Sequence, residues 1–251
     1  MNFFADAFAY IFTGAHWSGE NGIGPRLVEH LVYTGISVLI AIVIAVPIGL
    51  AVGHTGRGRN AVVAVTGAAR AIPTFGLLLF IVFLYGLGLV PLVVVLVILA
   101  IPPLLAGVYA GIESIDRGII DAARAVGMSE WQILGGVEIP LGLPLMIGGL
   151  RSAVLQVIAT ATIAAYVGLD GLGGFLIDGL AVRDYTIAIV GAILVAALAL
   201  VIDAILALIQ KLVVPRGVSR GTAGTTRSTG NRSNRPRTAI RMPITQGEGT
   251  Q

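Results

Sequence analysis

The sequence contains no cysteine and few charged or aromatic residues, and each shortage excludes a class of protein. Without cysteine the chain has no disulfide framework, no thiol chemistry and no cysteine to lipidate. Charged residues make up 12% and aromatic residues 6% of the 251 residues, whereas 56% are hydrophobic and the mean hydropathy is +0.94. A soluble domain of this length cannot bury so much apolar surface. The composition therefore predicts an all-α integral membrane protein with several spans.

Five segments are long and apolar enough to cross a bilayer, which takes roughly 20 residues of helix. We expect them at about 31–52, 72–89, 91–112, 141–167 and 187–214. Residues 26–215 would then form a transmembrane domain. An extracytoplasmic amphipathic segment is expected at 1–25, and a polar, basic and disordered cytoplasmic tail at 216–251.

Basic residues are distributed unevenly among the predicted loops. Arg57 and Arg59 follow the first span, and Arg117 and Arg124 follow the third, whereas the loop after the second span carries no charge. Cytoplasmic loops carry the excess of Lys and Arg in membrane proteins. The distribution thus predicts that the N-terminus lies outside and the C-terminus in the cytoplasm, with the loop at 113–139 on the cytoplasmic side.

This loop contains an acid-Ala-Ala sequence, a Gly six residues after the acid, and an aliphatic-x-aliphatic-Pro sequence before the fourth span. The residues are Asp121, Ala122, Ala123, Gly127, Val137, Ile139 and Pro140. The pattern resembles the EAA loop of ABC importer permeases, with Asp for Glu, Val for Ile and Ile for Leu. In that family the loop docks on the ATP-binding subunit, so the resemblance implies that residues 113–139 couple the chain to an ATPase.

The local sequence is suited to such a docking element. We expect a short helix at about 117–127, in which Ala122 and Ala123 allow a partner backbone to come close. Gly127 can adopt the positive φ that ends a helix, and Ser129 can cap the next turn. The alternative interpretation is that the apolar and charged residues of this loop form an ordinary amphipathic helix between two spans, without a docking role.

The resemblance extends over roughly residues 25–215. Residues 69–80, 101–116 and 148–180 resemble permeases of the osmoprotectant branch, which import glycine betaine, carnitine, choline or proline betaine. Methionine importer permeases have similar fourth spans and are the alternative within the superfamily. A stand-alone secondary transporter is a third possibility, but the chain shows no internal repeat of the kind that is common in such folds.

The family resemblance implies a five-helix type I ABC importer permease core in the bacterial cytoplasmic membrane. Its implied partners are a second permease subunit (identical or homologous), an ATP-binding subunit, an extracytoplasmic solute-binding protein and membrane lipid, but no nucleic acid. The sequence lacks the Gly-x-x-x-x-Gly-Lys-Ser/Thr phosphate loop. We therefore expect no catalytic residue, metal site or cofactor in this chain, and ATP with Mg²⁺ would bind the partner ATPase.

Two charged residues fall inside predicted spans, where ionisable groups are costly. Arg151 and Asp203 each lie about ten residues from the cytoplasmic end of their span, roughly 15 Å deep at 1.5 Å per residue. Their similar depth predicts an ion pair between the two helices. A place on the transport path is the alternative.

Uncharged polar residues in the second and fourth spans are candidates for lining a path through the membrane. They are Thr74, Gln156, Thr160, Thr162 and Tyr166. Hydrogen bonding between packed helices is the alternative role for such side chains. Aromatic residues do not cluster in the sequence, so we expect the path to bind a quaternary ammonium solute weakly.

Overall fold

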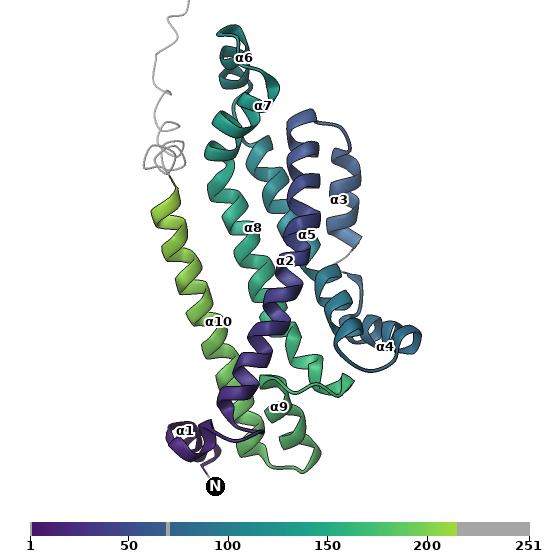
Figure 1. The fold of residues 1–251 in the computed structure, drawn as a ribbon, viewed down its shortest axis with the longest axis vertical. Helices are drawn as coiled ribbons and strands as arrows, with labels where there is room; N and C mark the ends of the chain where they lie inside the picture. Colours follow the sequence, from purple (N-terminus) through teal and green to yellow (C-terminus); the bar gives the residue numbers. More distant parts are fainter. Residues whose placement is uncertain (1, 69–70, 215–251) are drawn as a thin grey trace, which may run out of the picture. The chain divides into compact units, whose positions relative to one another are not determined.

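The computed structural model describes residues 2–68 and 71–214, and every regular element in them is a helix (Figure 1). In chain order the elements are α1 (Phe3–Phe12), the 3₁₀ turn η1 (Gly14–Trp17), α2 (Ile23–Thr55), α3 (Arg59–Ala68), α4 (Thr74–Tyr85), α5 (Leu89–Glu113), α6 (Arg117–Ala125), α7 (Glu130–Ile133), the π-helical η3 (Leu134–Glu138), α8 (Ile139–Thr160), the 3₁₀ segment η4 (Ala161–Val167), α9 (Leu172–Ala181) and α10 (Tyr185–Val213). The predicted tail at 216–251 lies outside the described residues.

Four helical stretches in the described part of the chain are long and apolar enough to cross a membrane: α2, α5, the run from α7 to η4, and α10. The shortest, α5, has 25 residues and measures about 37 Å, which exceeds the roughly 30 Å thickness of a hydrocarbon core. These stretches contain the predicted spans at 31–52, 91–112 and 141–167, and all but the last residue of the span at 187–214. The chain is an all-helical membrane protein.

The expected second span at 72–89 is not a single helix of spanning length in the structure. Its helical part is α4, whose 12 residues extend only about 18 Å, and α3 is a separate helix of 10 residues. Pro73 explains the start of α4, because its ring disfavours helical backbone at Ile72 and it lies in extended conformation before the first turn. At the other end Gly86 has a φ of +82°, which ends α4.

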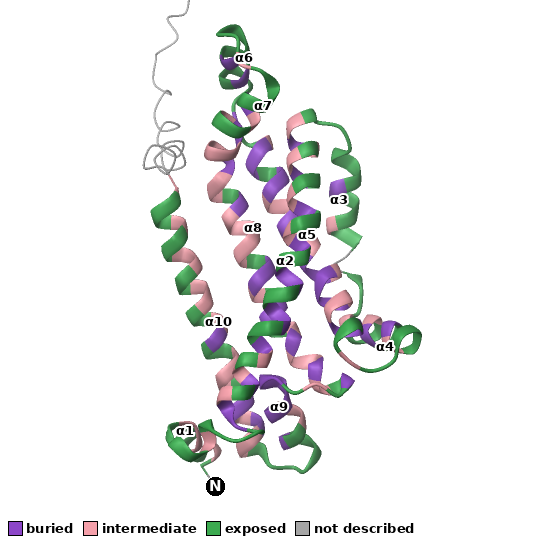
Figure 2. Ribbon diagram, in the orientation of Figure 1, coloured by how far each residue is buried: buried purple, intermediate pink, exposed green. Residues whose placement is uncertain are grey.

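Helix α5 packs against both α2 and α8, and glycines allow the close approach. A Cβ atom on Gly53 of α2 would lie 2.6 Å from Cβ of Ile112. A Cβ on Gly149 of α8 would lie 2.7 Å from Cα of Gly107 on α5. Small residues that bring backbones together are the usual means of packing helices in lipid, where no hydrophobic force drives helices together. Figure 2 shows the consequence, since α5 is the long helix richest in buried residues.

The outer surfaces of α2 and α10 carry large aliphatic side chains. Exposed residues on α10 include Leu200, Val201 and Leu212. Figure 2 shows exposed and half-buried residues along most of α10. Large aliphatic side chains on the outside of a spanning helix are suited to contact with acyl chains.

The two ends of the long helices differ in the short elements that they carry. Figure 1 shows α6 and α7 at one end and α1 and α9 at the other. At the α9 end, Arg26 is buried beside carboxylates, with its Nη2 atom 3.1 Å from Asp178 and 3.4 Å from Asp170. The Arg26 guanidinium also lies 4.5 Å from the centre of the Phe175 ring, so α2 is tied to α9 by both charge and stacking.

Candidate functional site

The segment with the acid-Ala-Ala pattern folds into two short helices joined by a tight turn. Asp116 caps α6, because its carboxylate accepts a hydrogen bond of 2.8 Å from the Gly118 N–H. Gly127 follows α6 with a φ of +89°, which is the conformation predicted for it. Ser129 is the N-cap residue of α7, and its N–H donates to Oε1 of Gln132 at 2.8 Å.

The two faces of α6 have different surroundings. Ile120 and Ala123 are buried against Ile133 of α7 in a small core that is separate from the main one. Ala123 therefore packs inside the chain, and of the two alanines only Ala122 is exposed. With Ile119 and Val126, spaced three and four residues away, Ala122 forms an exposed apolar stripe on one side of α6. We call Ile119, Ala122 and Val126 the α6 stripe. Asp121, beside it, is also exposed.

The end of the pattern forms the junction between these short helices and α8. Val137 packs on the small core, whereas Ile139 packs on the main core. Pro140, in the first turn of α8, has no N–H to donate to the carbonyl four residues earlier. The N–H of Ile139 instead donates to Leu134, five residues earlier, which gives the π-helical turn η3. The aliphatic-x-aliphatic-Pro sequence thus determines the backbone conformation at the junction between the α6–α7 unit and α8.

His54, in the last turn of α2, lies between two carboxylates from this junction. Its Nδ1 atom is 2.6 Å from Oε2 of Glu138, and its Nε2 atom is 3.2 Å from Oε2 of Glu130. Glu138 is only 2% exposed. Glu130 in turn accepts two hydrogen bonds from Arg124 of α6, from Nε at 2.9 Å and from Nη2 at 3.1 Å. These bonds raise the pKa of Arg124 above its ordinary value. We call these four residues the His54 cluster; it joins α2, η3, α7 and α6.

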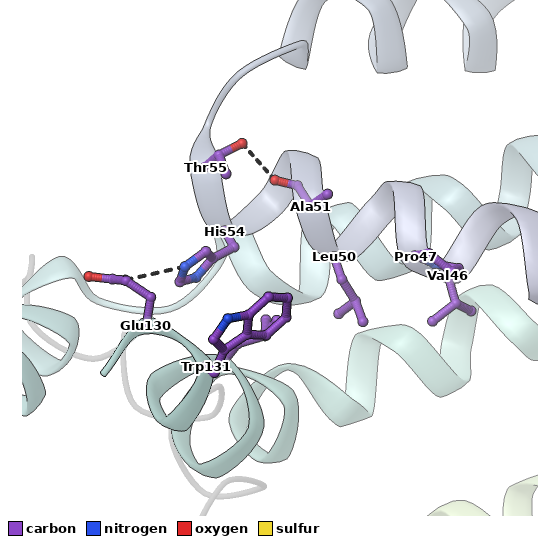
Figure 3. Close-up of a pocket in the computed structure, with 9 residues that line it drawn as sticks. Val46, Pro47, Leu50, Ala51, His54, Thr55, Glu130 and Trp131 are labelled. Carbon is purple, nitrogen blue, oxygen red and sulfur yellow. Dashed lines mark hydrogen bonds and ion pairs between the residues drawn. The ribbon is translucent and has the colours of Figure 1, made fainter. Parts of the chain in front are cut away.

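A cavity of about 550 Å³ lies beside the cluster, between α2 and the α7–η3 turn (Figure 3). It is lined by Val46, Pro47, Leu50, Ala51, His54, Thr55, Glu130, Trp131 and Leu134. Figure 3 shows His54 facing Glu130 at one end and Trp131 beside them. Trp131 is 83% exposed. The wall that α2 contributes is apolar apart from His54 and Thr55.

The structure shows the local surroundings of the five residues that the sequence suggested for a path through the membrane. Gln156 donates to the Leu99 carbonyl at 3.2 Å, and the Thr162 hydroxyl donates to the Ala159 carbonyl at 2.8 Å. Thr74 and Thr160 are half-buried. Tyr166 instead meets a residue that the sequence did not suggest, Phe75.

The rings of Phe75 and Tyr166 form an edge-to-face pair, with centres 5.0 Å apart and planes at 69°. Phe75 is in the first turn of α4 and Tyr166 is in η4, so the pair brings together residues far apart in the sequence. Both rings are about half exposed. Sequence spacing gave no sign of this aromatic contact.

The exposed side of α8 differs from that of α10. Ser152, Gln156 and Ala159 are exposed on α8 at spacings of four and three residues, and Tyr166 is exposed in the 3₁₀ segment η4 that follows. These side chains are small or polar, unlike the aliphatic cover of α10, and Leu145 is the exposed aliphatic residue nearer the start of α8. Such a surface suits contact with protein, water or a polar solute better than contact with lipid. We call Ser152, Gln156, Ala159 and Tyr166 the α8 face.

Comparison with known proteins places the chain in a family. Residues 37–216 match the family described as "Binding-protein-dependent transport system inner membrane component". The chain belongs to this family. It is a multi-pass inner membrane permease of a bacterial ABC importer, and the ATPase of such an importer is a separate subunit.

Two relatives and one solved structure illustrate the similarity. The chain is 33% identical to the glycine betaine/carnitine/choline transport system permease protein OpuCB of Bacillus subtilis, over 76% of this chain and 88% of the relative. It is 34% identical to the osmoprotectant import permease protein OsmW of Salmonella typhimurium, over 76% and 91%. An inward-facing structure of the MetNI methionine ABC transporter aligns with a TM-score of 0.65 and 25% identity, over 74% of this chain and 94% of that one.

The permease also brings Arg151 and Asp203 together across α8 and α10. The Arg151 Nε atom donates to Oδ1 of Asp203 at 2.9 Å, and Nη2 donates to Oδ2 at 2.8 Å. Gln210 extends the contact, since it accepts from Arg151 at 3.2 Å and donates to the Pro144 carbonyl at 3.1 Å. The two charged side chains are each about 30% exposed. Their role, structural or on the transport path, stays a prediction.

Two parts of the site were missed at the level of the sequence. The sequence did not suggest a role for His54, although Glu130 and Glu138, eight residues apart before the fourth span, were a possible signal for an acidic partner. Phe75 was not considered, because a Phe in an apolar span is ordinarily core or lipid-facing. Both are defined by contacts between segments at least 75 residues apart, which no local pattern encodes.

Proposed function

We propose that this permease forms the membrane path of an importer for a quaternary ammonium osmoprotectant such as glycine betaine, carnitine or choline. The similarity to OpuCB and OsmW over three quarters of the chain carries this proposal. The edge-to-face pair of Phe75 and Tyr166 supports it, because aromatic ring faces attract quaternary ammonium groups. Import of methionine is the alternative, and the likeness to the methionine transporter structure supports it at fold level.

Five crossings are proposed for the core, with α3 and α4 together forming the second. Neither helix is long enough alone, but their combined 22 residues are of spanning length. The N-terminus is proposed to lie outside and the C-terminus in the cytoplasm. In support, Arg57, Arg59 and Arg117 lie at the α6 end of the long helices, as the excess of basic residues in cytoplasmic loops requires.

Residues 113–139 are proposed to dock on the ATPase through the α6 stripe. The stripe is apolar, exposed and held on a unit with its own small core, so it can enter a groove of another protein without rearranging. A second permease subunit, identical or homologous, is proposed to complete the path. The solute-binding protein is proposed to dock at the α9 end, opposite the ATPase.

The α8 face is proposed to line the path, with Thr74, Thr160 and Thr162 near its outer half. Its small and polar side chains support this placement, because the exposed surfaces of α2 and α10 consist mainly of large aliphatic residues. Phe75 and Tyr166 supply two aromatic rings, fewer than the several rings that surround a quaternary ammonium group in a high-affinity aromatic cage. A site of that kind binds a solute weakly enough to release it, as a transport path requires.

The test is uptake of radiolabelled glycine betaine, choline, carnitine and methionine in cells that lack this chain, with and without high external salt. Loss of salt-stimulated quaternary ammonium uptake, restored by the chain, is the expected result. Loss of methionine uptake alone would assign the permease to the alternative. A pull-down of the ATPase, weakened by Ala122→Glu in the α6 stripe, tests the docking surface separately.

A further inference from the structure

Glu138 is the one acidic residue that is fully buried in the described part of the chain. A buried carboxylate is costly unless a partner neutralises it and satisfies its hydrogen bonds. The only partner that the structure gives Glu138 is Nδ1 of His54, at 2.6 Å. The burial of Glu138 therefore depends on the state of the His54 ring.

The protonation of this contact follows from its geometry. Both ring nitrogens of His54 face carboxylate oxygens, at 2.6 Å and 3.2 Å. A neutral imidazole can donate from one nitrogen only, and an ionised carboxylate can only accept. Both contacts are hydrogen bonds when one proton lies on Nε2 and another lies between Nδ1 and Glu138. If the second proton leaves, two lone pairs face each other at a short distance inside the protein.

The charges around the ring balance when both protons are present. His54 faces Glu138 from η3 and Glu130 from α7, and Arg124 from α6 neutralises the second carboxylate. The rest of the cavity lining is uncharged. With a protonated ring the four residues of the His54 cluster sum to zero charge, and Asp121 adds one exposed carboxylate 3.4 Å from Arg124. Removal of the proton leaves the buried Glu138 without a compensating charge.

We propose that His54 is a positioning residue that transmits movement of the α6–α7 unit to α2 and α8, and that this link holds only while the His54–Glu138 contact keeps its proton. The inference rests on the proposed function, because the α6–α7 unit moves only if an ATPase docks on it. Glu138, the residue before α8, contacts Nδ1 of the ring, and Glu130 of α7 contacts Nε2. Figure 3 shows the contact with Glu130.

The experiment uses the full chain reconstituted with its ATPase and solute-binding protein in liposomes, and measures solute taken up per ATP hydrolysed. His54→Ala and Glu138→Ala each remove the link, and the ratio should fall about tenfold, the effect of losing one charged hydrogen bond. The matched control is Thr55→Ala, because Thr55 is adjacent to His54 but its hydroxyl bonds only to nearby backbone, donating to the Ala51 carbonyl and accepting from the Arg57 N–H, and it makes no hydrogen bond with α7 or η3. Its ratio should equal that of the wild type.

The variant Glu138→Gln tests whether Glu138 acts through a proton-dependent hydrogen bond to His54 or only supports the local structure. The new amide can donate to Nδ1 of a neutral ring while Nε2–H still donates to Glu130, so the link no longer needs the extra proton. The wild-type ratio should therefore fall as the pH is raised far enough to remove that proton, whereas the Glu138→Gln ratio should stay high and flat over the same pH series.

The proposal is overturned if His54→Ala keeps the wild-type ratio, if Glu138→Gln loses coupling as Glu138→Ala does, or if the wild-type and Glu138→Gln pH profiles coincide. If the His54→Ala chain does not assemble with the ATPase, the comparison of wild type with Glu138→Gln decides. Failure of the proposed function looks different: the wild-type complex would show no ATP-dependent uptake of any solute at any pH.

Discussion

The contact between α5 and α8 at Gly107 and Gly149 allows a stringent test of the fold. A Cβ added at Gly149 would lie 2.7 Å from Cα of Gly107 and 2.9 Å from the Pro103 carbonyl oxygen. Ordinary contact begins near 3.4 Å, so Gly149→Ala must push the helices apart by about 0.7 Å. The obstructing atoms are backbone atoms, which cannot rotate away.

The neighbouring glycine supplies the matched control. A Cβ at Gly148 meets nothing within 4 Å, so Gly148→Ala gains helix propensity without a clash. Because Gly149→Ala gains the same propensity, the difference between the two variants isolates the clash, about 1–3 kcal/mol. For a chain of this length 2 kcal/mol corresponds to about 4–8 °C in Tm.

The assay is thermal unfolding of each purified variant in the same lipid nanodiscs. Gly149→Ala should unfold at a lower temperature than Gly148→Ala by the amount above. If the two variants unfold at the same temperature, the backbones of α5 and α8 are not in contact at this position. The packing that orients the α8 face would then be wrong.

Three further predictions concern charge, aromatic contact and docking. Arg151→Asp or Asp203→Arg alone should destabilise the permease by about 1–3 kcal/mol, since the pair is only partly buried. The double variant that exchanges the two residues should restore Tm, and failure to restore it contradicts the pairing. Phe75→Leu should lower choline uptake about two- to fivefold, whereas Phe83→Leu, an exposed residue on the same helix, should not; equal effects refute a ring contact with the solute. Arg124→Gln should speed hydrogen exchange of the α7 amides, measured by mass spectrometry, and unchanged exchange would show that its bonds to α7 do not hold that turn.

The sequence predicted those parts of the fold that depend on local chemistry. Gly127 ends α6 with positive φ, and Ser129 begins α7, because both effects act within one helical turn. Long apolar runs likewise gave four spanning stretches in their expected places. The helix within the expected second span at 72–89 is shorter than predicted, because hydropathy averages over Pro73 and Gly86, where α4 begins and ends.

The remainder of the site depends on contacts that a single sequence does not contain. The small core under α6 determines which alanine of the pair faces outward. Ala123 is buried because it packs against Ile133 in that core. The contact between His54 and Glu138 joins residues 84 positions apart. Counting residues from the span ends predicted that Arg151 and Asp203 lie at the same depth in the membrane. Their bidentate hydrogen bonds also depend on how α8 and α10 are rotated relative to each other, which residue counting does not give.

If the proposed link at His54 holds, α8 connects the docking unit to the proposed path. Glu138, directly before α8, contacts His54, which also contacts Glu130 of the docking unit, and Gly149 lies in the middle of α8 directly against α5. Gln156 lies two turns further on, facing the proposed path. From Leu145 onward α8 continues without a proline, although Pro144 removes one internal hydrogen bond nearer its start. We expect a shift of the α6–α7 unit that reaches this part of α8 to move the α8 face or to break the contact at Gly149. The Gly149→Ala variant, which loosens that contact, should for this reason reduce solute uptake per ATP as well as Tm.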